Sequence, residues 1–440
     1  MVSLENLYAV YQHHPIVCTD SRQVTPGCLF FALKGEKFDG NRFVQQVLAD
    51  GAAYAVTDAP PAAADPDRCL RVPDTLEALQ DLANYHRRQF DIPVIAIGGS
   101  NGKTTTKELV SAVLSSHYPC HSTKGNLNNH IGVPLTLLAM PAETEVAVIE
   151  VGANHAGDIE QLCAIAEPTH GLLTNIGKEH LEGFGSIGGV KKAEGELFEY
   201  LARQNGCAFV NASEKYLSKM SRAVNKKVVY AAAETLRAQD SLVDIQMISN
   251  QPFVHAAFLS ESGQTVKLDT QLMGHHNFHN IMTAVALGVY FKVPASKIKS
   301  AIETYRPANN RSQVLTHGSN TIFLDAYNAN PSSMRVALET LQSAKAGKKV
   351  ALLGDMLELG AESEKEHRAI LRFAASLQLD ALVVVGQEFA RCASSRYNAL
   401  SFPDAGTAKA WYDLQRFEDA FILVKASRGI GLERVVAASP

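Results

Sequence analysis

The sequence predicts an α/β protein with three domains, and three observations support this. Its 440 residues amount to about three domains of typical size. Apolar strands alternate with amphipathic helices from about residue 94 to residue 201, which is typical of a parallel sheet covered by helices. The first of these strands runs through a glycine turn straight into a helix, which indicates a phosphate-binding loop, or P-loop. We therefore expect a central P-loop parallel sheet flanked by two further domains.

Two boundaries divide the chain. The first domain is expected over residues 1–88, because Pro93 prevents the helix before it from continuing. The central domain is expected over 89–307, and a shorter strand period between about 225 and 272 predicts an antiparallel appendage on it. The last domain is expected over 308–440, where strands and helices alternate again as in a doubly wound, Rossmann-like fold.

The expected elements follow in order along the chain, and apolar runs between polar or glycine-rich turns define the strands. The first domain has strands at 28–33 and 52–56 and helices at 44–48 and 75–88. The central domain has strands at 94–97, 146–151 and 171–174, helices at 103–115, 158–166 and 190–201, and appendage strands at 253–259 and 265–272. The last domain has strands at 321–324, 350–353, 381–385 and 421–424, with helices between them.

Composition and charge exclude several classes of protein. Hydrophobic residues make up 46% of the chain and charged residues 20%, which argues against disorder. The formal net charge of -4 gives no electrostatic reason to expect nucleic acid or an anionic membrane as a partner. No apolar run approaches membrane length, and the seven cysteines form no Cys-x-x-Cys pair. We expect a cytoplasmic protein with unpaired, buried thiols and no membrane insertion.

The glycine turn has the residues that phosphate binding requires. Gly99 and Gly102 lack a Cβ, so backbone N–H groups can approach an anion, and the helix that begins near Lys103 adds its positive dipole end. Lys103 would neutralise the β- and γ-phosphates, and the Thr104 hydroxyl would bind Mg²⁺. Ile97 stands where the strict pattern has glycine, so the loop is a shortened variant. The expected nucleotide contacts are Gly99, Ser100, Asn101, Gly102, Lys103, Thr104 and Thr105.

Polar residues that follow other strands and turns fit the same site. Glu150 ends an apolar strand at the edge where open α/β sheets bind ligands, and it is either a Mg²⁺ ligand or a solvated acid. His180 is either a second metal ligand or a capping histidine. Asn277 and Asn280 open a later helix, where their amides either read an adenine edge or cap the first turn. Three histidines in that segment have no carboxylate or cysteine beside them, so zinc is not favoured.

In this order the clusters resemble the Mur ligase family, the ATP-dependent amide-forming enzymes of peptidoglycan assembly, over nearly the whole chain. Family-wide marks include the P-loop, Glu150, His180, Asp20-Ser21-Arg22, Phe31 to Gly35, and His276-Asn277 with Asn280. Segments 125–134, 180–186, 325–334 and 353–360 look like the member that adds D-alanyl-D-alanine to UDP-N-acetylmuramoyl-tripeptide. The sister ligase that adds the third amino acid usually carries an Asp-Asn-Pro-Arg motif, which this chain lacks.

The resemblance implies ATP and Mg²⁺ as cofactors, and UDP-N-acetylmuramoyl-tripeptide and D-alanyl-D-alanine as substrates. The first domain would hold the UDP-sugar, the central domain ATP, and the last domain would close over the nucleotide and the dipeptide. A substrate carboxylate attacks the γ-phosphoryl of ATP, and the dipeptide amine then attacks the resulting acyl phosphate. Lys103 and Mg²⁺ offset the repulsion between the two anions in the first step. We expect a monomer.

The resemblance also implies roles for individual residues. Thr104 and Glu150 would bind one Mg²⁺, and His180 would bind the second. Asn277 or Asn280 would contact adenine, Asp325 would contact the ribose, and Arg311 would contact the γ-phosphate. Asn126 and Asn129 would contact the sugar-peptide, and Ser21, Lys34 and Gly35 its uridine diphosphate. Without the resemblance, the sequence is equally consistent with a surface arginine in a linker at position 311.

One departure from the family concerns the second Mg²⁺. Relatives usually place a carbamylated lysine where this chain has Glu194, so we expect Glu194 to supply the carboxylate directly. Both groups present two oxygens and one negative charge. The alternative is a solvated acid on a helix face beside Lys191 and Lys192.

In a second departure, Ala426 replaces a family glycine, which is tolerated if that position does not need a positive φ. With Glu194 included, the residues expected to act on the reacting groups are Lys103, His180, Glu194 and Arg311.

Two alternative functions are weighed against this one. A P-loop protein that binds ATP to regulate a partner would explain the glycine turn, but not the Asn, His and Tyr-Asn clusters elsewhere. Another amide ligase, such as the third-residue-adding Mur enzyme or a folate or cyanophycin-type ligase, would explain more of them. The Asp20-Ser21-Arg22 segment disfavours the folate and cyanophycin types. Dependence of ATP hydrolysis on both a UDP-sugar-peptide and a dipeptide would separate these functions.

Overall fold

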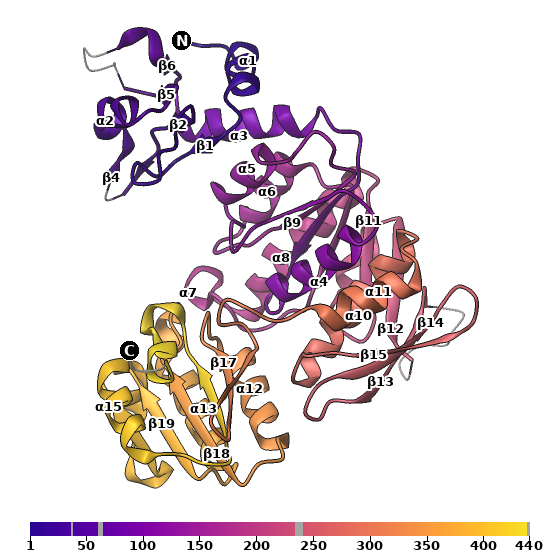
Figure 1. Ribbon diagram of the computed structural model, residues 1–440, viewed down its shortest axis with the longest axis vertical. Helices are drawn as coiled ribbons and strands as arrows, with labels where there is room; N and C mark the ends of the chain where they lie inside the picture. The colour runs from indigo at the N-terminus through magenta and orange to yellow at the C-terminus, as the bar shows by residue number, and fades with distance from the viewer. Residues whose placement is uncertain (37, 60–64, 234–240, 438–440) are drawn as a thin grey trace.

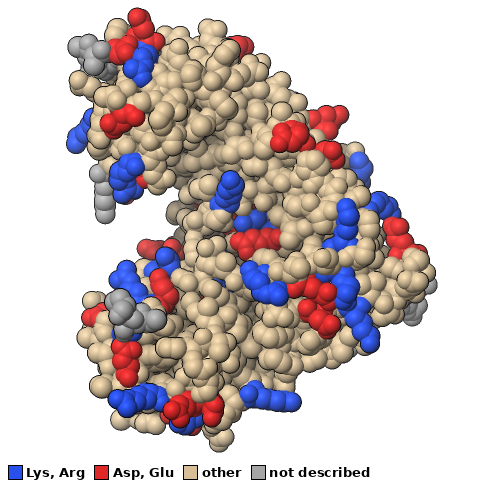
Figure 2. All heavy atoms as spheres, in the orientation of Figure 1, with Lys and Arg blue, Asp and Glu red and all other residues tan. Residues whose placement is uncertain are grey.

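The computed structural model describes residues 1–36, 38–59, 65–233 and 241–437, and it consists of three α/β units, each built around its own sheet (Figure 1). The sheets have four strands near the N-terminus, nine in the middle and six near the C-terminus. In Figure 1 the N-terminal and C-terminal units lie on the same side of the central unit, and the molecular surface is deeply notched between them (Figure 2). The expected fold class is confirmed.

The N-terminal unit is a small parallel sheet in the order β1-β2-β5-β6. Its elements are α1 Leu4–His13, β1 Val17–Cys18, β2 Leu29–Phe31, α2 Val44–Ala49, β5 Tyr54–Thr57, β6 Cys69–Arg71 and α3 Thr75–Arg87, with a separate antiparallel pair, β3 Lys34–Gly35 and β4 Phe38–Asp39. Helix α3 begins where expected because the Asp74 side chain accepts hydrogen bonds from the backbone N–H groups of Leu76 and Glu77.

The central sheet contains the predicted strand and helix alternation. Its elements are β7 Val94–Gly98, α4 Lys103–Ser115, β8 Cys120–Ser122, α5 Gly132–Leu138, β9 Val146–Glu150, α6 Asp158–Ala166, β10 His170–Leu173, α7 Leu181–Phe184, α8 Ile187–Arg203, β11 Cys207–Asn211, α9 Leu217–Met220 and β12 Lys226–Ala232. Strands β12, β11, β10, β7, β9 and β8 are neighbours in that order, and all these pairs are parallel. Helices α4 and α6 coincide with the predicted ranges.

The antiparallel appendage is present, but it extends the central sheet instead of standing apart from it. Its strands are β13 Asp244–Ser249, β14 His255–Leu259 and β15 Thr265–Asp269, followed by α10 His275–Tyr290 and α11 Ala295–Thr304. Strand β12, inside the range expected to be antiparallel, pairs in parallel with both β11 and β13. Only the β13-β14-β15 part is antiparallel. Residues 234–240 of the expected range lie outside the described residues.

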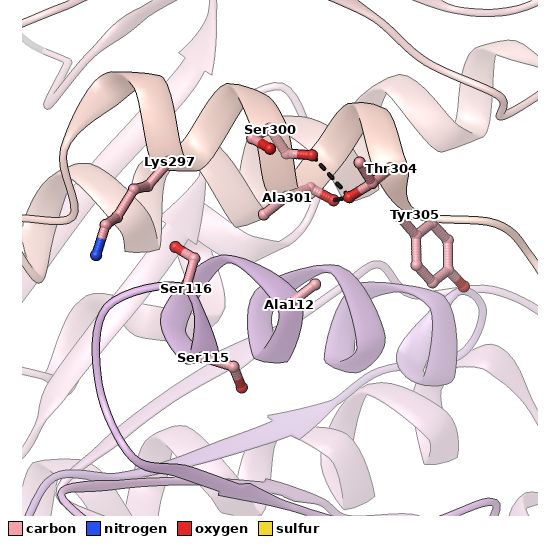
Figure 3. Close-up of a pocket in the computed structure, with 8 residues that line it drawn as sticks. All are labelled: Ala112, Ser115, Ser116, Lys297, Ser300, Ala301, Thr304 and Tyr305. Atoms are coloured by element: carbon pink, nitrogen blue, oxygen red, sulfur yellow. Dashed lines mark hydrogen bonds between the residues drawn. The ribbon is translucent and has the colours of Figure 1, made fainter.

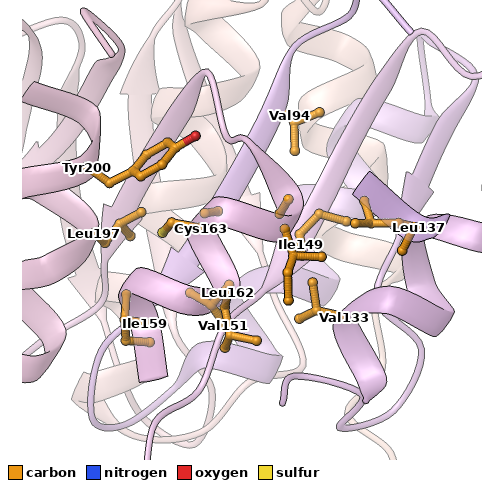
Figure 4. Close-up of a cluster of buried hydrophobic side chains, with 14 of the residues drawn as sticks. Val94, Val133, Leu137, Ile149, Val151, Ile159, Leu162, Cys163, Leu197 and Tyr200 are labelled. Carbon is orange, nitrogen blue, oxygen red and sulfur yellow. The ribbon is translucent and has the colours of Figure 1, made fainter. Parts of the chain in front are cut away.

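Both faces of the central sheet are buried, which explains its uninterrupted apolar strands. Along β7, Val94 and Ala96 belong to one hydrophobic cluster and Ile95 and Ile97 to another, as the two-residue period of a strand requires. The first cluster packs the sheet against α5, α6 and α8 (Figure 4). The second packs it against α4, α10 and α11. The loops at the strand ends are therefore held by a sheet that is covered on both sides.

The C-terminal unit is a six-stranded sheet in the order β16-β17-β21-β18-β19-β20, parallel except for β16. Its elements are β16 Gln313–His317, β17 Asn320–Asp325, α12 Pro331–Ser343, β18 Lys348–Gly354, α13 Ser363–Ala375, β19 Ala381–Val385, α14 Gln387–Cys392, β20 Ala399–Phe402, α15 Ala405–Gln415 and β21 Ala420–Lys425. The four predicted strands are confirmed. The two strands that sequence reasoning missed, β16 and β20, are half-exposed edge strands without an apolar run.

Three smaller expectations can also be compared with the structure. All seven cysteines are free thiols, five of them buried. Ala426 is not among the residues with positive φ, so alanine causes no backbone strain there. Within the described ranges, no helix combines the length and the apolar character needed to cross a bilayer.

We predict that Leu162→Ala destabilises the central unit. Leu162 lies on α6, is 1% exposed, and packs against the sheet (Figure 4), so its truncation leaves a cavity. The expected loss in free energy of unfolding is about 2–5 kcal/mol. Leu414→Ala is the matched control, because Leu414 is 79% exposed on α15, and the expected change there is below about 0.5 kcal/mol. Urea unfolding followed by far-UV circular dichroism compares the two, and equal midpoints would contradict the assigned core.

Candidate active site

A cavity of about 500 Å³ opens at the carboxyl edge of the central sheet. Loops after β7, β9 and β10 line one side of it, and residues of the C-terminal unit line the other. The predicted site residues that line it are Ser100, Asn101, Gly102, Lys103, Thr104, Thr105, Asn126, Asn129, Glu150, His180, Asn280, Arg311 and Asp325. The fold therefore brings most of the candidate residues from two units into one place.

A second hollow, of about 420 Å³, lies between α4 and α11 (Figure 3). Its lining is mostly short side chains of the two facing helices, together with Lys297 and Tyr305. It contains none of the predicted site residues. The chemistry therefore belongs to the cavity at the sheet edge.

The glycine turn has the backbone conformation expected of a phosphate-binding loop. Gly99 has φ 108° and Gly102 has φ 81°, both in the region that favours glycine. A Cβ on Gly99 would lie 2.4 Å from the Thr174 hydroxyl and 2.6 Å from its backbone nitrogen. A Cβ on Gly102 would lie 2.8 Å from the side-chain oxygen of Asn280. Both glycines are required by close packing, and α4 begins at Lys103 directly after the turn.

Lys103 is surrounded by carboxylates. Its ammonium contacts the backbone oxygen of Gly99 and lies 3.5 Å from a carboxylate oxygen of Glu179. Burial alone would lower the pKa of Lys103, but Glu179, Glu194 and Glu150 outweigh it, so the pKa is raised. Lys103 is therefore held as a cation, ready for anionic phosphates.

Glu150 and Thr104 meet at the floor of the cavity. Glu150 ends the fully buried strand β9, and its Oε1 accepts hydrogen bonds from Thr104 Oγ1 at 3.2 Å and from Asn128 Nδ2 at 2.8 Å. Its other oxygen, Oε2, is buried and accepts no hydrogen bond from any described residue. A buried carboxylate oxygen with no partner is unfavourable unless a cation or water meets it.

Glu194 is buried beneath the loop, and it is not a cavity-lining residue. It lies on α8, is 1% exposed, and its Oε2 accepts a hydrogen bond of 2.6 Å from the Gly99 N–H. Burial raises its pKa to about 7, against the opposing effect of Lys103. The solvated-acid interpretation of Glu194 is wrong, because the side chain is not on an exposed helix face.

His180 lines the cavity but already has a partner. Its Nδ1 lies 2.7 Å from Oε2 of Glu358, which belongs to the C-terminal unit. The residue has φ 41°, which is uncommon for a side chain other than glycine. His180 follows Glu179, whose carboxylate is 4% exposed and whose Oε1 has no hydrogen-bond partner among the described residues.

The two asparagines of α10 are both buried. The Asn277 amide donates to the Met273 carbonyl at 2.7 Å, and its side-chain oxygen accepts from Asn280 at 2.8 Å. Asn280 lines the cavity and accepts from the Thr106 hydroxyl at 3.0 Å. Asn280 is therefore the one of this pair placed where it can meet a ligand.

The C-terminal unit presents three charged groups to the cavity, Arg311, Asp325 and Lys425. The Arg311 guanidinium lies over the Tyr327 ring, 3.6 Å from its centroid. Asp325 ends β17, and one of its oxygens is 2.6 Å from the ammonium of Lys425, which is 2% exposed. Burial opposes ionisation of Asp325, but Lys425 outweighs it, so the pKa of Asp325 is lowered. Arg311 is therefore a cavity residue and not a surface arginine of a linker.

The candidate substrate residues occupy two places. Asn126 and Asn129 line the cavity, although the Asn129 oxygen also accepts a hydrogen bond of 2.8 Å from the Gly132 N–H at the start of α5. Ser21, Lys34 and Gly35 belong to the N-terminal unit and do not line it. The Lys34 ammonium pairs instead with Asp58 at 2.8 Å.

The donor groups at the sheet edge suit a hard divalent cation. Hydroxyl and carboxylate oxygens are the ligands that Mg²⁺ prefers, and Glu150 and Glu179 each have a buried oxygen without a hydrogen-bond partner among the described residues. In the described part of the chain, however, no three His, Cys, Asp or Glu side chains converge closely enough to hold an ion. The expected ligands Thr104, Glu150, His180 and Glu194 are gathered around one loop but are not arranged as a closed coordination shell.

Several residues that line the cavity were not among the predicted site residues, and Glu179, Asn128, Tyr327 and Lys425 are examples. Lys425 follows an apolar strand as Glu150 does, so the same rule applied to β21 would have found it. Glu179 and Asn128 are the sequence neighbours of the predicted residues His180 and Asn129, and both members of each pair line the cavity. Apart from its place in segment 325–334, nothing in the sequence marked Tyr327 as a residue of the site.

Three segments of the sequence match patterns of known families. Residues 13–87 match the Mur ligase family catalytic domain, 97–288 the Mur ligase middle domain, and 310–428 the Mur ligase glutamate ligase domain. The chain is also similar to UDP-N-acetylmuramoyl-tripeptide--D-alanyl-D-alanine ligases. It is 36% identical to that of Escherichia coli, over 96% of this chain and 93% of the relative, and 33% identical to that of Bacillus subtilis, over 96% and 92%.

Solved structures agree with the sequence relatives. The fold is similar to a crystal structure of MurF from Acinetobacter baumannii, with a TM-score of 0.85, 31% identity, and coverage of 98% of this chain and 97% of that one. It is also similar to MurF ligase from Thermotoga maritima in complex with ADP, with a TM-score of 0.83, 25% identity, and coverage of 99% and 97%. Similarity over nearly the full length, in sequence and in fold, shows that the chain belongs to the Mur ligase family.

Proposed function

We propose that this chain is an ATP-dependent amide ligase that joins D-alanyl-D-alanine to UDP-N-acetylmuramoyl-tripeptide and releases ADP and phosphate, a step in peptidoglycan precursor synthesis. The observation that carries the proposal is the shared cavity, in which a P-loop lysine faces an arginine from the C-terminal unit. The full-length relatives named for this reaction support the choice of substrates.

The three units take different parts of the reaction in this proposal. Residues 1–88 hold the UDP end of the substrate through Ser21, Lys34 and Gly35, and residues 89–307 hold ATP. Residues 308–440 close over the nucleotide and the dipeptide. The notch between the N-terminal and C-terminal units (Figure 2) gives an extended substrate room to run from the uridine site to the cavity. We place this enzyme in the cytoplasm, where its nucleotide substrates are, and expect it to act as a monomer.

The first chemical step brings two anions together. The terminal carboxylate of the tripeptide attacks the γ-phosphoryl of ATP and forms an acyl phosphate while ADP leaves. Lys103 and the backbone N–H groups of the loop hold the phosphates and stabilise the charge on the transferring group. Arg311 reaches the γ-phosphate from the other side of the cavity. Thr104, Glu150, His180 and Glu194 would hold Mg²⁺, which offsets phosphate charge when bound.

The second step forms the amide. The amine of D-alanyl-D-alanine attacks the acyl phosphate carbonyl, and phosphate leaves from the tetrahedral intermediate. In the cavity Asn280 faces adenine and Asp325 the ribose, while Asn126 and Asn129 hold the sugar-peptide next to the γ-phosphate. Because these groups come from two units, the reactants are positioned only when the units stand together.

The test is a phosphate-release assay with each substrate omitted in turn. Phosphate release that needs ATP, the UDP-sugar-tripeptide and D-alanyl-D-alanine together supports the proposal. Phosphate release that needs neither substrate would instead indicate a regulatory ATPase. Addition of a single amino acid to a UDP-sugar-dipeptide would indicate the third-residue-adding ligase.

We predict that Lys103→Ala abolishes ligation without unfolding the protein. Loss of the ammonium removes the charge that offsets the phosphates, and the expected drop in kcat is at least about 10²- to 10³-fold. Burial raises the pKa of Glu194, so this side chain can take up a proton in place of the lost cation, and circular dichroism should stay native. Lys192→Ala, on the exposed face of α8, is the control and should ligate at the wild-type rate. Wild-type turnover of Lys103→Ala would contradict the P-loop assignment.

We predict that the C-terminal unit moves relative to the central unit when nucleotide binds. Arg311 and Asp325 belong to the C-terminal unit and the P-loop belongs to the central unit, so both units can hold the same ATP only if they close on it. Small-angle scattering should show a smaller radius of gyration with a non-hydrolysable ATP analogue and the UDP-sugar-tripeptide than without them. The Lys103→Ala variant should show no such compaction. An unchanged wild-type radius would count against the movement.

We predict that activity is independent of bicarbonate and that Glu194→Ala loses most turnover. Glu194 already provides a carboxylate, so no lysine has to be carbamylated at this position. Short carboxylates such as acetate should partly rescue the variant by entering the space the side chain leaves. Glu199→Ala, at an exposed position of the same helix, is the matched control. If Glu194→Ala keeps the wild-type rate and Mg²⁺ dependence, the second ion is held by other groups.

A further inference from the structure

The segment 353–360 of the C-terminal unit has no role in the proposed mechanism so far, although it is one of the specific motifs of the sequence. It begins at the end of β18, and Glu358 within it has φ 65°. Its contact partner His180 has φ 41°. Side chains other than glycine avoid this region unless the surroundings impose it, and such residues cluster at functional sites. Two of them in direct contact across two units therefore call for a functional explanation.

The contact between the two segments is specific and has several components. Glu358 Oε2 lies 2.7 Å from His180 Nδ1, and the Glu182 N–H donates to the Glu358 carbonyl at 3.3 Å. Leu181, between them in sequence, is 7% exposed and belongs to the hydrophobic cluster of the C-terminal unit. A Cβ on Gly360 would lie 3.3 Å from Glu182, so the segments also pack closely. The histidine ring is therefore oriented by the neighbouring unit.

The contact decides which ring nitrogen of His180 is available. A carboxylate at Nδ1 accepts the proton of that nitrogen and leaves the lone pair on Nε2. Histidines that bind metals in proteins are commonly held in this way by a carboxylate at the other nitrogen. His180 lines the cavity beside Glu179, whose Oε1 is buried and unpartnered. The contact at Nδ1 thus leaves Nε2 as the ring nitrogen that is free to meet a divalent cation at this edge of the cavity.

We propose that Glu358 is a positioning residue for the metal site: by holding His180 Nδ1 from the C-terminal unit, it makes the second divalent cation bind tightly only when the two units are docked. This inference rests on the proposed role of His180 as a ligand of that ion. Glu358 does not touch the ion or the reacting atoms. Its side chain is 56% exposed, so it does not serve the packing of a core.

The chain offers a matched comparison for this contact. Lys178 and Glu366 form another ion pair between the same two units, with a distance of 2.6 Å. Lys178 is two residues from His180, but its pair touches no candidate metal ligand. If inter-unit ion pairs act only by holding the units together, loss of either pair should have the same effect on metal binding. If Glu358 orients His180, only the loss of Glu358 should weaken it.

The experiment measures Mn²⁺ binding without turnover. Free Mn²⁺ is titrated by electron paramagnetic resonance in the presence of a non-hydrolysable ATP analogue, for wild type, His180→Ala, Glu358→Ala, Glu358→Gln and Glu366→Ala. We expect wild type to bind a second ion that His180→Ala loses. Glu358→Ala should bind that ion about 10- to 100-fold more weakly. Glu358→Gln keeps an oxygen that can accept from Nδ1, so it should lie closer to wild type, and Glu366→Ala should match wild type.

Pulsed electron paramagnetic resonance gives a second readout. The coupling of the imidazole nitrogen to Mn²⁺ should be present in wild type and Glu366→Ala and reduced in Glu358→Ala. Equal Mn²⁺ affinity in wild type and Glu358→Ala, while His180→Ala loses the ion, would overturn the positioning role and leave the proposed function intact. If Glu358→Ala and Glu366→Ala weaken Mn²⁺ binding equally, the contact between Glu358 and His180 only holds the units together, and the positioning role is overturned. Wild-type Mn²⁺ binding by His180→Ala would remove the metal role of His180 and this proposal with it.

Discussion

The ammonium of Lys103 is held among three carboxylates, Glu150 at the end of β9, Glu179 in the loop after β10, and Glu194 on α8. Parallel strands bring their carboxyl ends to one edge of a sheet, so these groups meet although more than forty residues of sequence separate the first from the last. Negative charge exceeds positive charge there before any phosphate enters. A nucleotide that binds at this edge adds further negative charge and favours the entry of cations, so charge balance is the constraint on which the site depends.

The cavity also depends on how two separately folded units are joined. Their junction is largely polar: Asn330 donates to the P-loop residue Asn101 at 2.8 Å, and Ser332 accepts from the Lys178 N–H at 3.0 Å. Polar contacts of this kind form and break at small net cost in free energy, because water replaces each lost hydrogen bond. Leu181 and Met273 of the central unit add apolar contacts to the hydrophobic cluster of the C-terminal unit. The junction is thus specific in geometry yet compatible with repeated opening, as an enzyme that must admit three reactants requires.

Sequence reasoning located what depends on local pattern and missed what depends on tertiary contact. The P-loop, α4 and the end of β9 follow from glycine placement and apolar runs, so Gly99, Lys103 and Glu150 could be identified in advance. The parallel pairing of β12 could not, because a half-buried strand has the same pattern in either direction. Nor could the burial of Glu179, because its contact with Lys103 joins residues that are distant in the sequence.

Strand β21 lies between β17 and β18 in the C-terminal sheet, yet it follows all five other strands of that sheet along the chain. During synthesis, the edges of β17 and β18 that pair with β21 therefore stay unpaired until β21 has left the ribosome. Lys425, at the end of β21, pairs with Asp325 in the same register. A chain that stops short of β21 lacks both the centre of this sheet and the counterion of Asp325. Completion of the C-terminal side of the cavity is in this way tied to completion of the chain.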